Sequence, residues 1–316
     1  MAMGSRAEDN PLYHIWKRNF SFTYWDNRIG KLSRYNSEDR LDSLYVLMQL
    51  SDLYAHLFTV EVRNPNQPWF MVTEKTYKEQ IRGTLKKLEV DDPEHGPMIS
   101  VSNLQNEPEG LISFDMVDED ANVTKRDAIA RDLLGALAPY NKETKELEYD
   151  IDPELYLAMV NATLNFWKGN KALLNDLKHG FRVLPFDAET VDHLEAQDFF
   201  PEQQEDVDEF QSLLRQKEEQ GWGITIARLE ADKEGDRYEV TVHIHYVDSE
   251  MCLKMAELVQ RQLYNLFYPH RALSVEEEVA HLVALAGEEP NELEVIKHLG
   301  SFEIFYDPTD SVEEGS

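Results

Sequence analysis

Hydrophobic and polar positions along the first third of the chain change their period several times. Residues 20–25 alternate aromatic and small polar side chains, and this period of two predicts a strand. From Ser37, a favoured N-cap residue, apolar residues recur at helical spacing to about His56, which predicts a helix. Further elements are expected in this third: extended segments at 58–63 and 68–73, a helix at 74–88 and a hairpin between 99 and 116.

The strongest helical pattern lies in the middle of the chain. Asp152 followed by Pro153 is typical of a helix start, and apolar residues continue at helical spacing to about Lys178, with Gly169 as a candidate break. Shorter or later elements are expected as follows: helices at 124–137 and 205–219, strands at 224–229 and 238–247, a helix at 249–267, helices near 274–286 and 290–299, and a strand at 302–306. The predicted fold class is α+β, predominantly helical, with antiparallel β-hairpins in the N- and C-terminal thirds.

Length and composition divide the chain into consecutive segments. The 316 residues correspond to about two domains of roughly 150 residues each, and 42% hydrophobic residues are enough for a core. The expected segments are an N-terminal α+β domain at 1–120, a charged linker or variable loop at 121–150, a helical middle at 151–220 and a C-terminal α+β domain at 221–316.

Several classes of protein are disfavoured by the same composition. No apolar run approaches the roughly 18–20 residues of a membrane span, and residues 1–10 lack the apolar stretch of a signal peptide. The single cysteine, Cys252, allows neither an internal disulfide nor a multi-thiolate metal site. The sequence also lacks a Gly-rich phosphate loop and a Gly-x-Ser-x-Gly elbow, which disfavours common NTPases and α/β-hydrolases. We therefore expect a cytoplasmic protein without a membrane partner.

The net charge is the most unusual global property. The chain carries 61 acidic and 31 basic residues, a formal charge of −30. At physiological ionic strength the Debye length is about 8 Å and such a surface repels itself, whereas at about 1 M salt the length falls to about 3 Å. In this respect the composition resembles that of haloarchaeal cytoplasmic proteins. The alternative is a protein whose carboxylates imitate nucleic acid, which would need acids gathered on one face; their scatter along the chain favours solvation in high salt.

The charge is distributed unevenly. Residues 1–87 hold 13 basic and 10 acidic residues, a net of +3, which leaves −33 for residues 88–316. Within the basic part, aromatic residues and cations are interleaved between Tyr13 and Tyr35. The candidate binding residues of this segment are Trp16, Lys17, Arg18, Phe22, Tyr24, Trp25, Arg28, Lys31 and Arg34.

This basic aromatic segment indicates a binding surface. Cations neutralise phosphates and aromatic rings stack on unpaired bases, the combination used to bind single-stranded nucleic acid. The alternative is that the aromatic side chains are core residues of a first strand. Together with the lack of a complete catalytic set, the segment predicts a non-enzymatic cytoplasmic binding or interaction protein of a halophile. Its expected partner is a protein, a single-stranded nucleic acid or another anionic molecule, and no cofactor is expected.

A second candidate site ends the long predicted helix, at Asn175-Asp176-Leu177-Lys178-His179-Gly180-Phe181-Arg182. Cations favour a helix C-terminus and Gly favours its cap, so a structural explanation is sufficient. The segment also resembles the Asn-x-x-Lys-His-Gly segment of HEPN-type helical domains, over about residues 150–184. That resemblance implies, as an alternative function, a metal-independent ribonuclease with His179 as general acid/base and Arg182 as phosphate clamp. His179 precedes Arg182, which departs from the Arg-then-His order on one helix in such enzymes.

A third candidate site is formed by His243 and His245 on the predicted strand 238–247. Their spacing places both imidazoles on one face of the strand, opposite Val242 and Ile244. Two such imidazoles can share a metal, which gives a metal-dependent enzyme as a further alternative function. A metal site needs at least three converging ligands, however, and the sequence identifies no third. The polar face of a half-exposed strand is the simpler interpretation.

Overall fold

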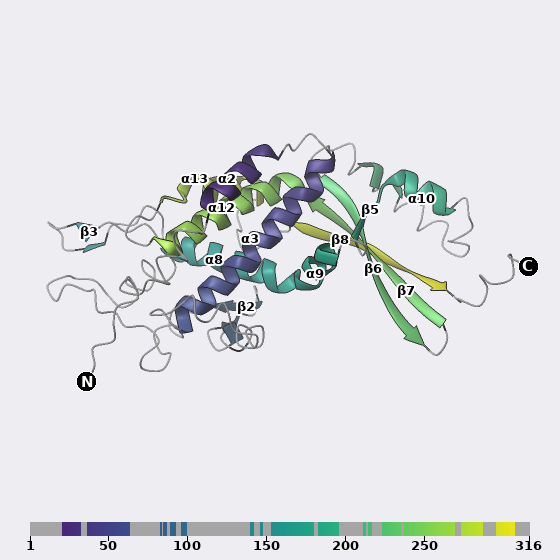
Figure 1. The fold of residues 1–316 in the computed structure, drawn as a ribbon, viewed down its shortest axis with the longest axis horizontal. Helices are drawn as coiled ribbons and strands as arrows, with labels where there is room; N and C mark the ends of the chain where they lie inside the picture. Colours follow the sequence, from purple (N-terminus) through teal and green to yellow (C-terminus); the bar gives the residue numbers. More distant parts are fainter. Residues whose placement is uncertain are drawn as a thin grey trace, which may run out of the picture. The chain divides into compact units, whose positions relative to one another are not determined.

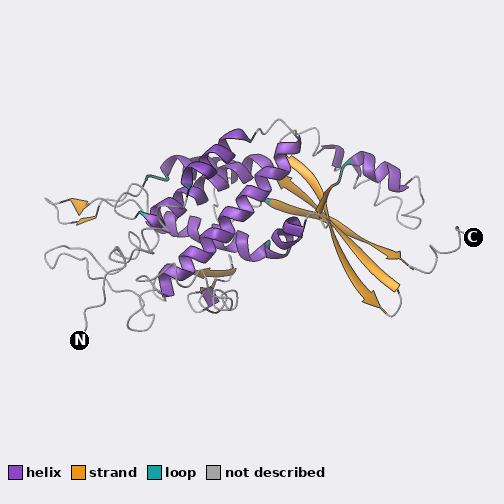
Figure 2. Ribbon diagram, in the orientation of Figure 1, coloured by secondary structure: helices purple, strands orange, loops and turns teal. Residues whose placement is uncertain are grey.

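The computed structural model describes the chain in separate stretches. The described residues are 21–32, 37–63, 83, 85–86, 89–92, 96–99, 140–141, 146–147, 153–179, 183–195, 211–212, 214–216, 223–234, 237–268, 273–286 and 295–306. They form mostly helices together with a four-stranded antiparallel sheet (Figure 1, Figure 2), which confirms the α+β class. They belong to two compact units, each assembled from three separated segments, whereas the sequence pattern divides the chain into consecutive segments.

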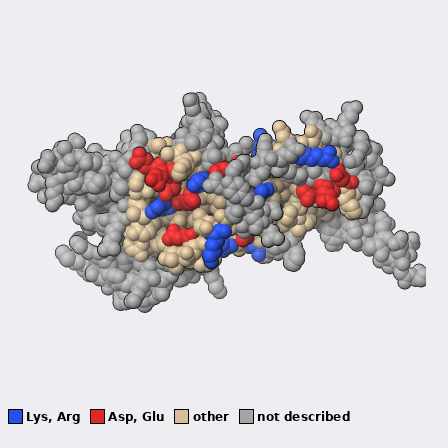
Figure 3. Space-filling model, turned by 90° about the horizontal axis from the view of Figure 1, so that it is seen from above, with Lys and Arg blue, Asp and Glu red and all other residues tan. Residues whose placement is uncertain are grey.

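Acidic and basic side chains are intermixed on the face of the molecule shown in Figure 3. Among the described residues, several opposite charges lie in direct contact. Lys254 Nζ is 2.9 Å from Glu257 Oε2, and Arg261 Nε is 3.1 Å from Glu278 Oε1. In these two contacts of the first unit, acids are paired with bases, whereas imitation of nucleic acid would require acids gathered on one face.

The first unit comprises residues 1–31, 47–169 and 254–293. Its described elements are α2 (Phe22–Lys31), the later part of α3 (Ser37–Arg63), the hairpins β1 (Glu89–Asp92) with β2 (Gly96–Ile99) and β3 (Tyr140–Asn141) with β4 (Glu146–Leu147), α8 (Pro153–Gly169), the later part of α12 (Ser249–Phe267) and α13 (Glu276–Ala286). Fully buried side chains come from α3, α8 and α12, among them Tyr54, Tyr156 and Leu258. The core of this unit is therefore built between helices.

Two hydrogen bonds join α8 to its neighbours inside this core. Trp167 Nε1 donates to Asp52 Oδ1 of α3 at 2.8 Å. Thr163 Oγ1 lies 3.1 Å from Gln262 Oε1 of α12, to which it donates. Because buried polar groups must find partners, these bonds fix the positions of α3 and α12 relative to α8 more narrowly than apolar packing alone.

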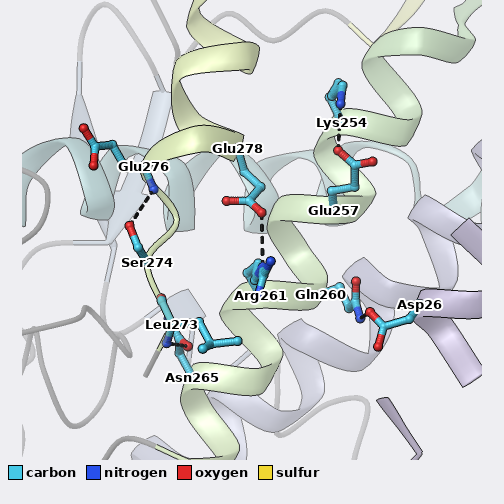
Figure 4. Close-up of polar contacts among 10 residues, drawn as sticks. All are labelled: Asp26, Lys254, Glu257, Gln260, Arg261, Asn265, Leu273, Ser274, Glu276 and Glu278. Atoms are coloured by element: carbon cyan, nitrogen blue, oxygen red, sulfur yellow. Dashed lines mark hydrogen bonds and ion pairs between the residues drawn. The ribbon is translucent and has the colours of Figure 1, made fainter. Parts of the chain in front are cut away.

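The short helix α2 packs on α12 through one side. The ring of Phe22 meets Tyr264 and Phe267 edge-on, with ring centroids 5.2 and 5.4 Å apart. Asp26, one turn later, accepts a hydrogen bond from Gln260, as Figure 4 shows. The side of α2 that carries Phe22 and Asp26 is therefore held by α12, and the opposite side faces away from it.

Helix α13 is joined to α12 by an ion pair and by hydrogen bonds from an α12 side chain to the loop that precedes α13 (Figure 4). Besides the Arg261–Glu278 pair, Asn265 Nδ2 donates to the carbonyl of Leu273 at 2.9 Å, and Asn265 Oδ1 accepts from the Leu273 N–H at 2.8 Å. One amide side chain thus satisfies both backbone groups of Leu273, which fixes the chain just before α13 begins.

Two predictions about the first third of the chain are wrong. Residues 22–25 belong to helix α2 and not to a strand, and residues 58–63 continue α3 to Arg63. A run of six alternating residues is too short to separate strand from helix. Phe22, Trp25 and Ile29 also lie at i, i+3 and i+7, so a helix brings them to one face for packing on α12. Packing on α12 therefore selects the helix over the strand.

The second unit comprises residues 32–46, 170–253 and 294–316. Its described elements are the first part of α3, α9 (Lys171–His179), β5 (Val183–Pro185), α10 (Ala188–Glu195), β6 (Gly223–Glu234), β7 (Arg237–Asp248), the start of α12 and β8 (Ile296–Tyr306). The strands form one sheet in the order β5-β6-β7-β8, and every neighbouring pair is antiparallel. Helix α9 packs against β5.

The two faces of this sheet differ as the alternation predicts. Val242, Ile244 and Tyr246 are buried, while His243 and His245 lie on the other face of β7. The helix predicted at 290–299 is wrong from residue 296 onward, because β8 begins there and pairs with β7 along nearly its full length. The partner strand, which is distant in sequence, determines this conformation.

Several predicted elements fall wholly or mostly outside the described residues. These are the extended segment 68–73, the hairpin between 99 and 116, the helix at 124–137, and most of the helices at 74–88 and 205–219. Within the described stretches, none of the helices combines the length and the apolar character needed to cross a membrane.

Candidate functional site

Helix α2 carries the described part of the basic aromatic segment. Tyr24, Arg28 and Lys31 are spaced i, i+4 and i+7, so they lie on the side turned away from α12. The Tyr24 side chain is 52% exposed, and its hydroxyl accepts a hydrogen bond from Arg28 Nη1 at 3.0 Å. Arg28 also donates to Gln49 Oε1 of α3 at 3.4 Å. We call Tyr24, Arg28 and Lys31 the outer face of α2.

The structure separates the predicted binding residues of this segment into different classes. Phe22 is packed into the aromatic contacts with α12, so it is a structural residue. Trp25 is half-buried, with its ring 5.0 Å from that of Tyr24. The remaining predicted residues lie outside the described part of the chain: Trp16, Lys17, Arg18 and Arg34.

The predicted nuclease pair is only half described. His179 is the last residue of α9, where the sequence predicts the helix to end. Arg182 lies outside the described residues. Asp176, one turn earlier, is buried and pairs with Arg228 of β6, with Nε 2.7 Å from Oδ2. The neighbourhood of His179 thus includes a structural ion pair, and the nuclease role stays a prediction.

The best-formed group of chemically active side chains lies on the face of the sheet that carries His243 and His245. A third imidazole, His298 of β8, joins them: its ring centroid is 5.1 Å from that of His245 and 6.2 Å from that of His243. Ser301 of β8 pairs directly with His243 across the ladder. We call His243, His245, His298, Ser301 and Glu230 the histidine cluster.

Sequence analysis missed His298 because an irregularity in β8 places it. His243 pairs with Ser301 and Ile244 with Gly300, but His245 pairs with His298, so Leu299 is an extra residue. Such a bulge shifts the alternation by one position, and it turns His298 to the same face as Ser301. Three residues of separation would otherwise put the two side chains on opposite faces. Only the pairing of β8 with β7 reveals this.

Polar contacts run continuously through the cluster. His243 Nε2 is 3.4 Å from Glu230 Oε2, and His243 Nδ1 is 2.9 Å from Ser301 Oγ. Ser301 Oγ is in turn 3.3 Å from His298 Nε2. One imidazole therefore bridges a carboxylate and a hydroxyl, and a second imidazole lies on the other side of that hydroxyl.

Arg228 of β6 holds the carboxylate end of this arrangement. Its Nη1 is 3.3 Å from Glu230 Oε2, while its Nε binds the buried Asp176 of α9. The guanidinium thus connects helix α9 to the histidine cluster. Because both carboxylates contact one planar cation, the orientation of Glu230 toward His243 depends on the Asp176–Arg228 pair.

His245 is the most strongly perturbed member of the cluster. Burial, followed by the neighbouring His298 and His243 and then Arg228, lowers the pKa of His245 from 6.5 to about 4. Each of these causes disfavours a positive charge on the ring. His245 is therefore a neutral imidazole at neutral pH.

This perturbation predicts a pH dependence of stability. Between about pH 6.5 and 4 the unfolded state protonates His245 while the folded state does not. The unfolded state then binds more protons, so the contribution of His245 to the free energy of unfolding is complete above about pH 6.5 and is lost as the pH falls toward 4. We expect urea unfolding of His245→Gln to depend less steeply on pH in this window than the wild type. If the free energies of unfolding of the two proteins depended equally steeply on pH, the lowered pKa of His245 would be contradicted.

The described residues give no support to the metal interpretation of His243 and His245. Among them, no three His, Cys, Asp or Glu side chains are placed so that they could hold a metal ion. The three rings of the cluster adjoin one another, but His243 directs its nitrogens to Ser301 and Glu230. The metal-dependent alternative stays a prediction.

In comparisons with protein-family models, curated proteins and solved structures, no match to this chain was found.

Proposed function

We propose that the protein is a binding protein that engages an anionic partner, a single-stranded nucleic acid, through the outer face of α2. The observation that carries the proposal is the exposed ring of Tyr24, held beside Arg28 and on the same side of the helix as Lys31. An exposed aromatic ring offers a stacking surface to an unpaired base, and the adjacent cations suit its phosphates. The Arg28–Tyr24 hydrogen bond keeps the cation beside the ring that would stack on the base.

The working environment we propose is a cytoplasm of high salt. The formal charge of −30 supports this, because repulsion over such a surface is relieved when ions shorten the Debye length. High salt also weakens the electrostatic part of nucleic-acid binding. Stacking on Tyr24 and close contacts of Arg28 and Lys31 would then carry more of the affinity than bulk charge.

The experiment measures binding of fluorescent single-stranded oligonucleotides by anisotropy, in low and in molar KCl. We expect Tyr24→Ala to weaken binding by about 5- to 150-fold, which corresponds to the roughly 1–3 kcal/mol of one base stacked on an aromatic ring. This loss should persist in molar KCl. Lys31→Ala should weaken binding mainly at low salt and reduce the salt dependence, because it removes a phosphate contact.

Arg215→Ala is the matched control, since this cation is also well exposed but lies in the second unit. It should leave the affinity of the oligonucleotide unchanged. Absence of binding at every salt concentration, or equal effects of Arg215→Ala and Lys31→Ala, would contradict the proposal. A protein that co-purifies in molar KCl and is lost from Tyr24→Ala would instead assign the outer face of α2 to a protein partner.

A further inference from the structure

A reactive serine is the strongest feature of the second unit that the binding function does not use. Ser301 is exposed and lies between two imidazoles, with His243 Nδ1 at 2.9 Å and His298 Nε2 at 3.3 Å from its Oγ. Behind His243 stands the carboxylate of Glu230, at 3.4 Å from Nε2. A nucleophile within hydrogen-bond reach of a base, with the base oriented by a third group, is the arrangement that activates serine hydroxyls.

The neutral tautomer of His243 with its proton on Nε2 suits its neighbour Glu230, because the carboxylate 3.4 Å away can only accept. In this tautomer Nδ1 is an acceptor. The hydroxyl of Ser301 therefore donates to His243 Nδ1, and its lone pairs are left to accept from His298 Nε2–H. Both hydrogen bonds of Ser301 then run in one direction, and its proton lies toward His243 Nδ1, the nitrogen that can accept it.

The surrounding strands hold this arrangement from both sides. Arg228 contacts Glu230 and is itself anchored on the buried Asp176, so a cation is fixed beside the carboxylate. The bulge at Leu299 brings His298 to the face of Ser301. Bulges commonly re-aim side chains at active sites, and here the bulge supplies a second imidazole beside the hydroxyl.

We propose that Ser301 is a nucleophile for acyl transfer from small, solvent-accessible esters, with His243 as its general base and Glu230 as a positioning residue. Ser301 Oγ attacks the ester carbonyl carbon while its proton passes to His243 Nδ1. The carbonyl carbon's bond to the alcohol oxygen breaks, and the alcohol leaves with that proton. Water then attacks the acyl-serine, gives a proton to His243 and releases the acid as that proton returns to Ser301. The net reaction is ester plus water to carboxylic acid plus alcohol.

The donor at His298 Nε2 has a defined role in this scheme. Negative charge develops on the carbonyl oxygen of the ester as Ser301 Oγ bonds to its carbon, and His298 Nε2, 3.3 Å from that Oγ, is close enough to donate to the new oxyanion. A hydrogen bond to developing charge lowers the barrier, since the donor is already in place before reaction. His298 is thus the side chain that we expect to stabilise the tetrahedral intermediate.

The first test is labelling of the full chain with a fluorophosphonate probe, which forms a bond from phosphorus to the serine oxygen as fluoride leaves. We expect one equivalent of probe, located on Ser301 by peptide mass spectrometry and absent from Ser301→Ala. His243→Gln should slow labelling by at least about 100-fold, the usual range for loss of a general base. Ser274→Ala is the matched control: Ser274 is exposed and its Oγ accepts from the Glu276 N–H at 3.2 Å, so labelling should not change.

A second readout separates a positioning role of Glu230 from a structural one. Glu230→Asp, which keeps a carboxylate beside His243, should retain more of the labelling rate than Glu230→Gln, which does not. A purely structural role would give the opposite order, because Gln matches the size of Glu and Asp does not. Hydrolysis of p-nitrophenyl acetate should follow the same order among the variants.

The proposal is overturned if Ser301 of the wild type takes up no probe between pH 5 and 9, in low and in molar KCl. It is also overturned if the probe maps to another serine. Both outcomes are read on the wild-type chain, so they do not depend on whether a variant folds. Neither bears on the outer face of α2, which lies in the other unit and is tested by oligonucleotide binding.

Discussion

Replacing Arg228 by Met is expected to lower the free energy of unfolding by roughly 3 kcal/mol, because Asp176 loses its guanidinium partner in a buried site. The Asp176 side chain is 7% exposed and Arg228 is 21% exposed, so water compensates little of the lost charge. Methionine keeps much of the length and packing of the arginine stem. The loss is measured by urea unfolding followed by circular dichroism at constant KCl.

A second Arg–Asp pair in the same unit provides the matched control. Arg215 Nη2 is 3.2 Å from Asp192 Oδ1, but these side chains are 57% and 50% exposed. Arg215→Met should therefore change the free energy of unfolding by less than about 1 kcal/mol. The double variant Arg228→Met with Asp176→Leu should recover much of the stability, since it removes the buried charge together with its partner. Equal losses in Arg228→Met and Arg215→Met would show that burial does not set the cost.

The Arg228 pair also shows where sequence analysis is effective and where it fails. The end of α9 at His179 and the hairpin of β6 and β7 follow from local signals, namely a Gly after the last helical residue, a turn cluster between the strands and strict alternation in β7. The contact between Asp176 and Arg228 joins residues 52 positions apart. Such a contact leaves no mark in the local pattern of either segment.

Each candidate site likewise combines features that local sequence predicts with features that only contacts between distant segments create. The spacing of His243 and His245 correctly predicts their shared face, but His298 and Ser301 join them only through pairing of β8 with β7 and the bulge at Leu299. For α2, the sequence identifies the aromatic and basic residues but predicts the wrong type of secondary structure. Alternation over six residues suggested a strand, whereas packing of Phe22 on α12 selects a helix and turns Tyr24 outward.

One helix that the sequence analysis did not predict is nevertheless preceded by a capping residue. Helix α10 begins after Asp187, whose Oδ1 accepts from the Thr190 N–H at 2.8 Å, as an N-cap residue does. Its apolar stripe is too short to stand out among the surrounding acids. A capping residue alone therefore marks a helix start only when the periodicity behind it is long enough to be recognised.

Replacing Trp167 by Ala is expected to cost about 3–5 kcal/mol of unfolding free energy, the usual range for removal of a large buried aromatic side chain. Trp167 is 3% exposed, and its Nε1 donates to Asp52 Oδ1 at 2.8 Å. The substitution thus leaves a cavity between α8 and α3 and removes a hydrogen bond that joins them. Trp167→Phe separates the two effects, because it keeps an aromatic ring and loses only the N–H donor and part of the volume.

The loss from Trp167→Phe should be smaller than that from Trp167→Ala, at about 1–3 kcal/mol, because the carboxylate of Asp52, which is 25% exposed, loses a donor while most of the space stays filled. Tyr24→Ala is the control for aromatic removal as such: its ring is 52% exposed, so the change should stay within about 0.5 kcal/mol. Urea unfolding followed by circular dichroism measures all three variants. A Trp167→Ala protein as stable as Tyr24→Ala would show that α8 does not pack on α3 through this side chain, since no filled core loses so large a ring without cost.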